Sequence, residues 1–212
     1  MLVLALDTAT PTLVAGLARW SADGGAEVLA ERAEPSGNRH AELLTPAIRG
    51  VLADAGLAMA NLDAVVAGLG PGPFTGLRVG VVTALTLADA CGIPAVGVCS
   101  LDAIGSGART VVTDARRKES YWATYDADGT RVSGPAVDRP AAVPVTGRIV
   151  GDPAFAERLG APVEPADVTT AGLLRAAAAQ LADPSSAGPL VPLYLRRPDA
   201  VPPTAIKAVS QP

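Results

Sequence analysis

The sequence has 212 residues, a formal net charge of −4, a pI of about 5.0 and a hydrophobic fraction of 49%. This length and composition allow one large or two small globular domains with a well-buried core. The acidic balance and an aromatic fraction of only 3% argue against an independent nucleic-acid binder, so we expect any contact with RNA to be shared with a partner.

The N-terminal segment predicts a cytoplasmic protein that begins with a strand. "MLVLALDTATP" has no basic region before its apolar run and reaches Asp7 too early for a signal peptide. No run approaches the ~18 apolar residues of a membrane span. With His40, Cys91 and Cys99 as the only histidine and cysteines, the usual zinc and disulfide spacings are absent, and a reducing compartment fits best.

The first 35 residues read as a three-stranded meander. Apolar runs at residues 2–7, 13–20 and 27–34 are separated by a polar turn after Asp7 and by the turn "SADGG".

The segment "NRHAELLTPAIRGVLADAG" predicts a helix. Its apolar stripe ends at Gly56, which we expect to follow the last helical residue, and the stripe consists of Leu44, Ile48, Val51, Leu52 and Ala55. Pro46 leaves two alternatives open. Either it lies inside the helix, against the carbonyl of Glu42, or Thr45 caps a second helix whose first residue is Pro46.

The least ordinary stretch is "GLGPGPFTGLRVG", between the buried strand "DAVVAGLG" and the apolar helix "TGLRVGVVTALTLADACG". The glycines and prolines at 70–73 end the strand and turn the chain, and Thr75 is expected to cap a helix that closes at Gly92. Free backbone N–H groups and Arg78 would welcome an anion at this helix start, although a tight connection explains the same residues. The pattern is not that of a nucleotide P-loop.

After this helix, "IPAVGVCS" predicts a buried strand, and Ser100 is expected to cap the short helix "LDAIG". Residues 109–133 then repeat the order of features of the N-terminal meander. Asp114 matches Asp7, and the turn residues "ADG" occur in both segments. The sequence therefore predicts two halves built on one plan.

We place an N-terminal lobe at residues 1–105 and a C-terminal lobe with an extended tail at residues 106–212, joined by a linker near residues 100–108. In the second half, "RIVGD" predicts a strand, and "PAFAERLG" and "TTAGLLRAAAAQLAD" predict helices. The proline-rich "VPLYLRRPDAVPPT" predicts an extended tail. Tyr194 with Leu195 is expected to pack this tail onto the fold.

Six segments occur in the order and approximate spacing of the TsaB (YeaZ) family: "LALDTAT", "NRHAELLTPAI", "GPGPFTGLRVG", "AVGVCSLDAI", "DARRKESYWATY" and "PLYLRRPDA". The resemblance covers nearly the whole chain, and "GPGPFTGLR" at residues 70–78 is its most specific part. Residues 133–186 carry little of it.

The resemblance implies an α/β fold of the ASKHA class (actin, Hsp70 and sugar kinase), with two related lobes that each contain a mixed sheet flanked by helices. It also implies a cytoplasmic, non-catalytic subunit that binds and activates TsaD in forming N6-threonylcarbamoyladenosine at position 37 of ANN-decoding tRNAs. The resemblance further implies that TsaE binds to this pair, that the chain contacts tRNA through the complex, and that no membrane is involved. The chain would form a homodimer when TsaD is absent.

Departures from the catalytic relatives argue against an activity of this chain. A metal-binding His-x-x-x-His pair is missing, since Leu44 stands four residues after His40. We therefore expect no metal, no catalytic residue and no glycoprotease activity of the M22 kind. Asp7 and Thr8 match a phosphate loop only vestigially, because "TATP" replaces the glycines that would admit a phosphate. ATP and a metal are expected in the partner subunits, and a stand-alone ATPase or kinase is the alternative.

The resemblance implies that helices of the N-terminal lobe form the partner interface. The helix after residue 74 is apolar nearly all round, so one face needs a cover, and its small residues at i, i+4 and i+8 would let a partner helix approach. The expected interface residues are His40, Leu44, Ile48, Phe74, Thr75, Gly76, Leu77, Gly80 and Ala84.

A second expected contact is the cationic turn of Arg116, Arg117 and Lys118. Three adjacent cations on a turn are typical of a solvated tip, and the resemblance favours equally a loop that contacts a partner or tRNA phosphate. Arg196 and Arg197 carry the same two alternatives.

Overall fold

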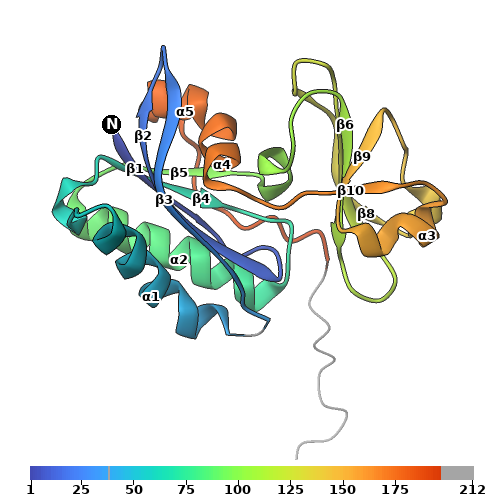
Figure 1. Ribbon diagram of the computed structural model, residues 1–212, viewed down its shortest axis with the longest axis horizontal. Coiled ribbons are helices and arrows are strands. Elements are labelled where there is room, and N and C mark those ends of the chain that lie inside the picture. Colours follow the sequence, from blue (N-terminus) through green and yellow to red (C-terminus); the bar gives the residue numbers. More distant parts are fainter. Residues whose placement is uncertain (38, 197–212) are drawn as a thin grey trace, which may run out of the picture.

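Two five-stranded mixed sheets form the centre of the protein (Figure 1), as seen in a computed structural model that describes residues 1–37 and 39–196. The first sheet has the strand order β3-β2-β1-β4-β5. Its strands are β1 (Leu2–Asp7), β2 (Thr12–Ser21), β3 (Gly25–Pro35), β4 (Ala64–Gly68) and β5 (Ala95–Val98). The predicted N-terminal meander is confirmed.

The second sheet repeats this plan with the order β8-β7-β6-β9-β10. Its strands are β6 (Arg109–Asp114), β7 (Ser120–Tyr125), β8 (Arg131–Asp138), β9 (Arg148–Gly151) and β10 (Val163–Pro165). In each sheet the first strand pairs antiparallel with the second and parallel with the fourth. The predicted internal repeat and the α/β fold of two related lobes are therefore confirmed. The short β10 was missed in the sequence.

The two faces of the first sheet are covered by helices from different parts of the chain (Figure 1). Because neighbouring strand residues point to opposite faces, Leu4 and Leu6 pack with the helices α1 (His40–Asp54) and α2 (Phe74–Cys91). Val3 and Ala5 pack with α4 (Thr170–Ala176), which is followed by α5 (Ala178–Ala182).

The remaining helices are short. α3 (Ala156–Leu159) has 4 residues at the position in the second lobe where α2 has 18 in the first. The single-turn helices are η1 (Met59–Asn61), η2 (Ser100–Ala103), η3 (Pro140–Ala142), η4 (Pro153–Phe155) and η5 (Pro184–Ser186).

Several predicted helix ends need correction. α1 is one helix with Pro46 in its interior, so the alternative of a second helix capped by Thr45 is wrong. Thr75 and Ser100 do not cap helices, because the residues before α2 and η2 are Pro73 and Cys99. Gly92 closes α2 in a left-handed conformation, as predicted. The helix predicted around residues 169–183 is divided into α4 and α5.

One hydrophobic core spans both lobes. It contains β1 and β4 residues of the first sheet, η2, α4, and residues of the second sheet such as Val111, Tyr121 and Val150. The fit of α4 is tight, since a Cβ atom on Gly16 of β2 would lie 1.7 Å from Oγ1 of Thr170. The division at 105/106 stays a prediction. In the structure, residues 170–182 pack on the first sheet although they follow the second in the chain.

α2 is long and apolar enough to cross a membrane by length and composition, with a mean hydropathy of 1.3 over its 18 residues. The statement that no run approaches this length was therefore wrong. One face of α2 nevertheless packs on the first sheet, through residues such as Leu77, Val81, Ala84 and Ala88. We assign it as a core helix of an α/β fold whose outer face is unusually apolar.

Candidate functional site

The aspartate predicted at a vestigial phosphate loop is fully buried and bonded within the chain. Oδ1 of Asp7 accepts a hydrogen bond from the amide of Ala9 (2.8 Å), and Oδ2 accepts one from the hydroxyl of Ser100. Oγ of Ser100 in turn accepts from the amide of Gly70 (3.0 Å). Hydrogen bonds to the carboxylate and to Ser100 thus connect the end of β1, the start of η2 and the loop before α2.

Burial raises the pKa of Asp7 to about 6, and the hydrogen bonds from Ser100 and Ala9 and the charge of His40 oppose this rise. Desolvation therefore dominates, although both carboxylate oxygens have donors.

The turn after β1 is packed directly on the start of α2. Oγ1 of Thr8 donates to the carbonyl of Gly76 (2.7 Å) and accepts from the amide of Gly80 (3.1 Å). A Cβ atom on Gly72 would lie 2.2 Å from the carbonyl oxygen of Ala9. The chain itself occupies the polar groups of Asp7 and Thr8 that would otherwise orient a magnesium-bound phosphate or a water.

Most of the predicted interface residues are buried within the chain itself, so their role in an interface stays a prediction. His40 is 6% exposed, and its Nε2 lies 2.9 Å from Oγ of Ser36 and 3.0 Å from the carbonyl oxygen of Thr10. The other buried members of the predicted set are Leu44, Ile48, Gly76, Leu77, Gly80 and Ala84. Phe74 and Thr75 are exposed.

The small residues of α2 leave space that the turn after β1 of the same chain fills, so this space is not open to a partner helix. A Cβ atom on Gly76 would lie 2.6 Å from the carbonyl oxygen of Thr8, and one on Gly80 would lie 2.3 Å from its Oγ1. A substitution at Gly80 would therefore disturb the fold and would not report on a partner.

The opposite side of α2 is the exposed apolar face. Phe74, Val82 and Leu85 are 43%, 59% and 45% exposed. Beside them a shallow groove of about 490 Å³ runs along α2 toward Ala41 of α1, and Arg78 and Val79 also line it. We call Phe74, Arg78, Val79, Val82 and Leu85 the α2 face. Phe74, Arg78, Val82 and Leu85 follow one another at intervals of 4, 4 and 3 residues, the spacing of one helix side, which the sequence offered as a signal.

The N-terminal end of the α2 face touches the C-terminal part of the described chain. The rings of Phe74 and Tyr194 have centroids 5.0 Å apart and planes tilted by 34°. The guanidinium of Arg78 lies 3.9 Å from the centre of the Phe74 ring, and its Nε donates to the hydroxyl of Tyr194 (3.1 Å). The prediction that Tyr194 packs the tail onto the fold is confirmed. Sequence reasoning missed its contact with α2.

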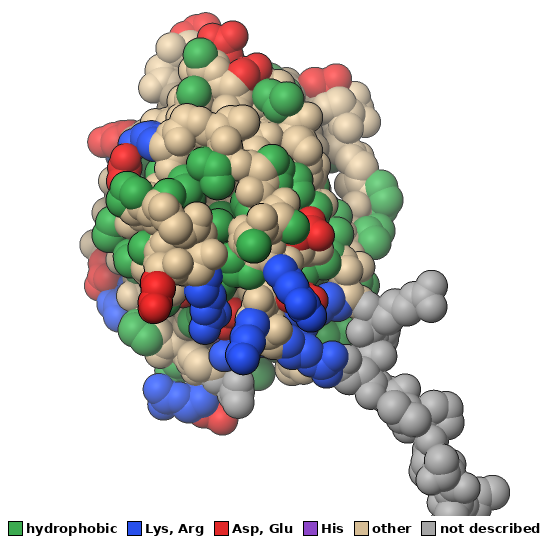
Figure 2. Space-filling model, turned by 90° about the vertical axis from the view of Figure 1, so that its right-hand side faces the viewer, with side chains coloured by type: hydrophobic (Ala, Val, Ile, Leu, Met, Phe, Trp, Pro, Cys, Tyr) green, Lys and Arg blue, Asp and Glu red, His purple; other side chains and the backbone are tan. Residues whose placement is uncertain are grey.

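The predicted cationic turn lies between β6 and β7. Arg116, Arg117 and Lys118 are exposed and have φ angles of 62°, 53° and 63°, a conformation that side chains disfavour. Arg116 and Arg117 line a hollow of about 310 Å³ together with Pro73 and Arg196. Lys and Arg side chains gather on this side of the protein, beside the point where the described chain ends (Figure 2). Arg197 lies outside the described residues.

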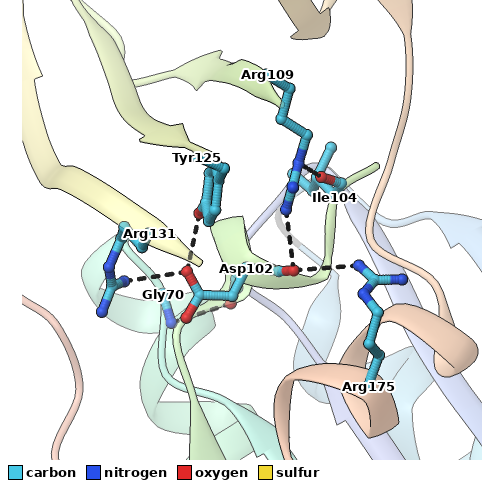
Figure 3. Close-up of polar contacts among 8 residues, drawn as sticks. Gly70, Asp102, Ile104, Arg109, Tyr125, Arg131 and Arg175 are labelled. Carbon is cyan, nitrogen blue, oxygen red and sulfur yellow. Dashed lines mark hydrogen bonds and ion pairs between the residues drawn. The ribbon is translucent and has the colours of Figure 1, made fainter. Parts of the chain in front are cut away.

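A polar network holds the linker between the lobes (Figure 3). The buried Arg109 donates to the carbonyls of Ile104 (2.7 Å) and Gly107 (2.8 Å). Burial lowers the pKa of its guanidinium, which lies 3.8 Å from the centre of the Tyr125 ring. The side chain of Asp102 accepts from the Tyr125 hydroxyl (2.8 Å).

The same linker is also held from the first lobe. Arg175 of α4 donates to the carbonyls of Gly105 (2.6 Å) and Asp102 (3.2 Å). From the second lobe, Arg131 of β8 pairs with the Asp102 carboxylate at 3.1 Å. The linker is therefore fixed from both sides.

The protein-family model described as "TsaD: tRNA N6-adenosine threonylcarbamoyltransferase" matches residues 27–200. The chain belongs to this family. The solved structure of YeaZ from Pseudomonas aeruginosa superposes with a TM-score of 0.75 at 28% identity, covering 92% of this chain and 99% of that one. Within the family, the chain groups with the TsaB (YeaZ) proteins.

Two relatives show how far the similarity extends along the chain. An uncharacterized protein of Mycobacterium tuberculosis is 52% identical over 94% of each chain. The "tRNA threonylcarbamoyladenosine biosynthesis protein TsaB" of Escherichia coli is 33% identical over 60% of this chain and 56% of its own. The likeness to the Escherichia coli protein thus covers little more than half of either chain.

Within residues 1–37 and 39–196, no group of three or more His, Cys, Asp or Glu side chains could hold a metal ion. His40 could offer a metal only Nδ1, because its Nε2 is bonded to Thr10 and Ser36.

The buried carboxylate of Asp7 predicts a specific pH dependence of stability. Its pKa is higher in the folded than in the unfolded chain, so the folded state binds the proton first and stability rises as pH falls through about 6 toward 3.8. We expect the wild type to gain about 1 kcal/mol more than Asp7→Asn between pH 7 and pH 5. Urea unfolding at both pH values measures this difference, and an identical pH response of the two proteins would contradict it.

Proposed function

We propose that this chain is a non-catalytic subunit that binds a TsaD-type transferase and activates it in forming N6-threonylcarbamoyladenosine at position 37 of ANN-decoding tRNAs. The observation that carries the proposal is the α2 face. It is a helix side whose apolar residues Phe74, Val82 and Leu85 remain exposed in the described chain, in a member of a family of threonylcarbamoyl transfer. Exposed apolar surface of this kind is typical of a protein interface.

The polar groups of the chain support a binding role over catalysis. The side chains of Asp7 and Thr8 are bonded within the chain. The linker is held from both lobes, and the central core contains residues of both sheets. An enzyme that closes on its substrate would need these contacts to break and reform. ATP and any metal of the reaction would then belong to the partner subunits.

The complex we propose is a cytoplasmic heterodimer with TsaD. TsaE binds to this heterodimer, and the chain contacts tRNA only as part of the complex. When TsaD is absent, the α2 face of one copy can cover that of a second, which gives a symmetric homodimer.

Val82→Asp tests the interface, because Val82 is 59% exposed at the centre of the α2 face and touches solvent in the free chain. Burying an unpaired carboxylate in an apolar interface is costly, so we expect affinity for the cognate TsaD to fall at least about 100-fold. Size-exclusion chromatography with light scattering and calorimetry measure the complex. Val132→Asp is the matched control, since Val132 is 69% exposed on β8 of the second lobe.

The interface is wrongly placed if Val82→Asp binds TsaD as the wild type does, or if Val132→Asp weakens binding equally. The alternative, a stand-alone ASKHA-type ATPase or kinase, predicts saturable one-to-one ATP binding by the isolated chain. Calorimetry with ATP and magnesium would detect it.

We also propose that the cationic turn contacts tRNA phosphate or an acidic partner surface within the complex. Arg116, Arg117 and Lys118 are exposed and bring positive charge to one turn of a chain of net charge −4.

Changing Arg116, Arg117 and Lys118 together to alanine is expected to lower tRNA modification several-fold, and the loss should shrink at high salt because the contact is electrostatic. Modification is measured in the reconstituted system, with the melting temperature of the chain as the control. If modification is unchanged, these residues form only a solvent-exposed turn and the proposed contact is wrong. If the melting temperature falls together with modification, the residues stabilise the fold instead of binding a partner.

A further inference from the structure

Residues 190–196, which we call the strap, cross from the first lobe to the second. The amide of Leu193 donates to the carbonyl of Leu69 (2.8 Å), directly before the loop that leads into α2. Leu193 and Leu195 pack against the core that spans both lobes, and Leu190 packs against the core beneath α1 and α2. The strap is therefore attached to the same loop that the Asp7 network holds.

One side chain of the strap belongs to the same exposed surface as the α2 face. Tyr194 is 40% exposed and stacks on Phe74, which is 43% exposed. Its hydroxyl accepts from Arg78, whose guanidinium also covers the Phe74 ring. The two long side chains at this end of the face are thus held in one arrangement by a residue outside α2.

The far end of the strap is held by the second lobe. Arg196 pairs with the carboxylate of Glu119 and donates to the carbonyl of Arg116 (3.3 Å). Both partners lie in the loop between β6 and β7, where Glu119 also donates its amide to the carbonyl of Arg116 (3.0 Å). A continuous series of contacts therefore leads from the second lobe, along the strap, to the surface of α2.

We infer that Tyr194 is a positioning residue of the docking surface, and that the second lobe acts on partner binding by holding the strap. The inference rests on the proposed function, and the occupant is the apolar helix surface of the TsaD-type partner that covers the α2 face. Fixing a rotamer-rich side chain on binding has an entropic cost. Because Tyr194 already holds Phe74 and Arg78 in one arrangement in the free chain, less of that cost remains to be met when the partner binds.

The test compares Tyr194→Ala, Tyr194→Phe and Val191→Ala in the full chain. Val191 is 58% exposed on the same strap and is the matched control. Tyr194→Ala frees two side chains and removes one ring, so we expect affinity for the cognate TsaD to fall about tenfold. Tyr194→Phe keeps the ring and loses the bond to Arg78, so its loss should be smaller. Val191→Ala should bind as the wild type does.

A second readout needs no partner. Hydrogen exchange in the free chain should speed up in the first two turns of α2 for Tyr194→Ala and stay near wild type for Tyr194→Phe. Glu119→Ala, which releases the strap at its far end, should weaken TsaD binding in the same direction by a smaller factor.

The outcomes separate the inference from the proposed function. If Val82→Asp abolishes binding and Tyr194→Ala leaves it unchanged, the inference is wrong and the proposed interface stands. If Val82→Asp binds normally, the proposed interface is wrong, and unchanged exchange in α2 of Tyr194→Ala then overturns the positioning role as well. An equal loss in Val191→Ala would also overturn it, because the effect would then not depend on the ring.

Discussion

The carboxylate of Asp7 is the point at which three distant segments of the chain meet. It accepts a hydrogen bond from the hydroxyl of Ser100, which follows β5. The same hydroxyl oxygen accepts a hydrogen bond from the amide of Gly70, which precedes α2. A buried carboxylate is tolerated only when it has donors, so these segments cannot separate without leaving a charge uncompensated. This requirement fixes the start of α2. It thereby also determines which side of the helix faces the solvent.

The contacts between the lobes favour a chain that works as a rigid body. Tyr121 and Val150 of the second sheet share a core with Val3 of the first, so opening the lobes would expose apolar area to water. The guanidinium groups of Arg109 and Arg175 hold the linker by donating to its backbone carbonyls. A rigid chain suits a subunit that presents one fixed surface to a partner.

Much of the fold could be predicted because its signals are local. Continuous apolar runs mark β1 and β2, Gly92 marks the end of α2, and the recurrence of Asp7 at Asp114 marks the repeat. The predicted helix cap at Ser100 was wrong because of a contact between residues far apart in the sequence. Ser100 has the chemistry of a cap, but its hydroxyl is engaged by a carboxylate 93 residues away.

The predicted interface residues of α2 lie mostly on its buried side, and the exposed apolar side of the same helix was not predicted. Gly76 and Gly80 have the spacing that a partner helix would use, and only the position of Thr8 reveals that the chain itself fills that space. The contact between Arg78 and Tyr194 joins residues 116 positions apart, a separation at which spacing carries no signal. Residue types therefore indicated that a surface existed, and the three-dimensional structure was needed to find it.

The packing of α4 on the first sheet has a consequence for the order in which the protein can fold during synthesis. Its residues Leu173 and Leu174 are fully buried against strands that the ribosome completes long before them. Until α4 has emerged, one face of the first sheet, including Val3 and Val14, has no helix to cover it. The nascent first lobe thus carries an open apolar face while the second lobe is being made, so folding of the two lobes is completed together rather than in turn.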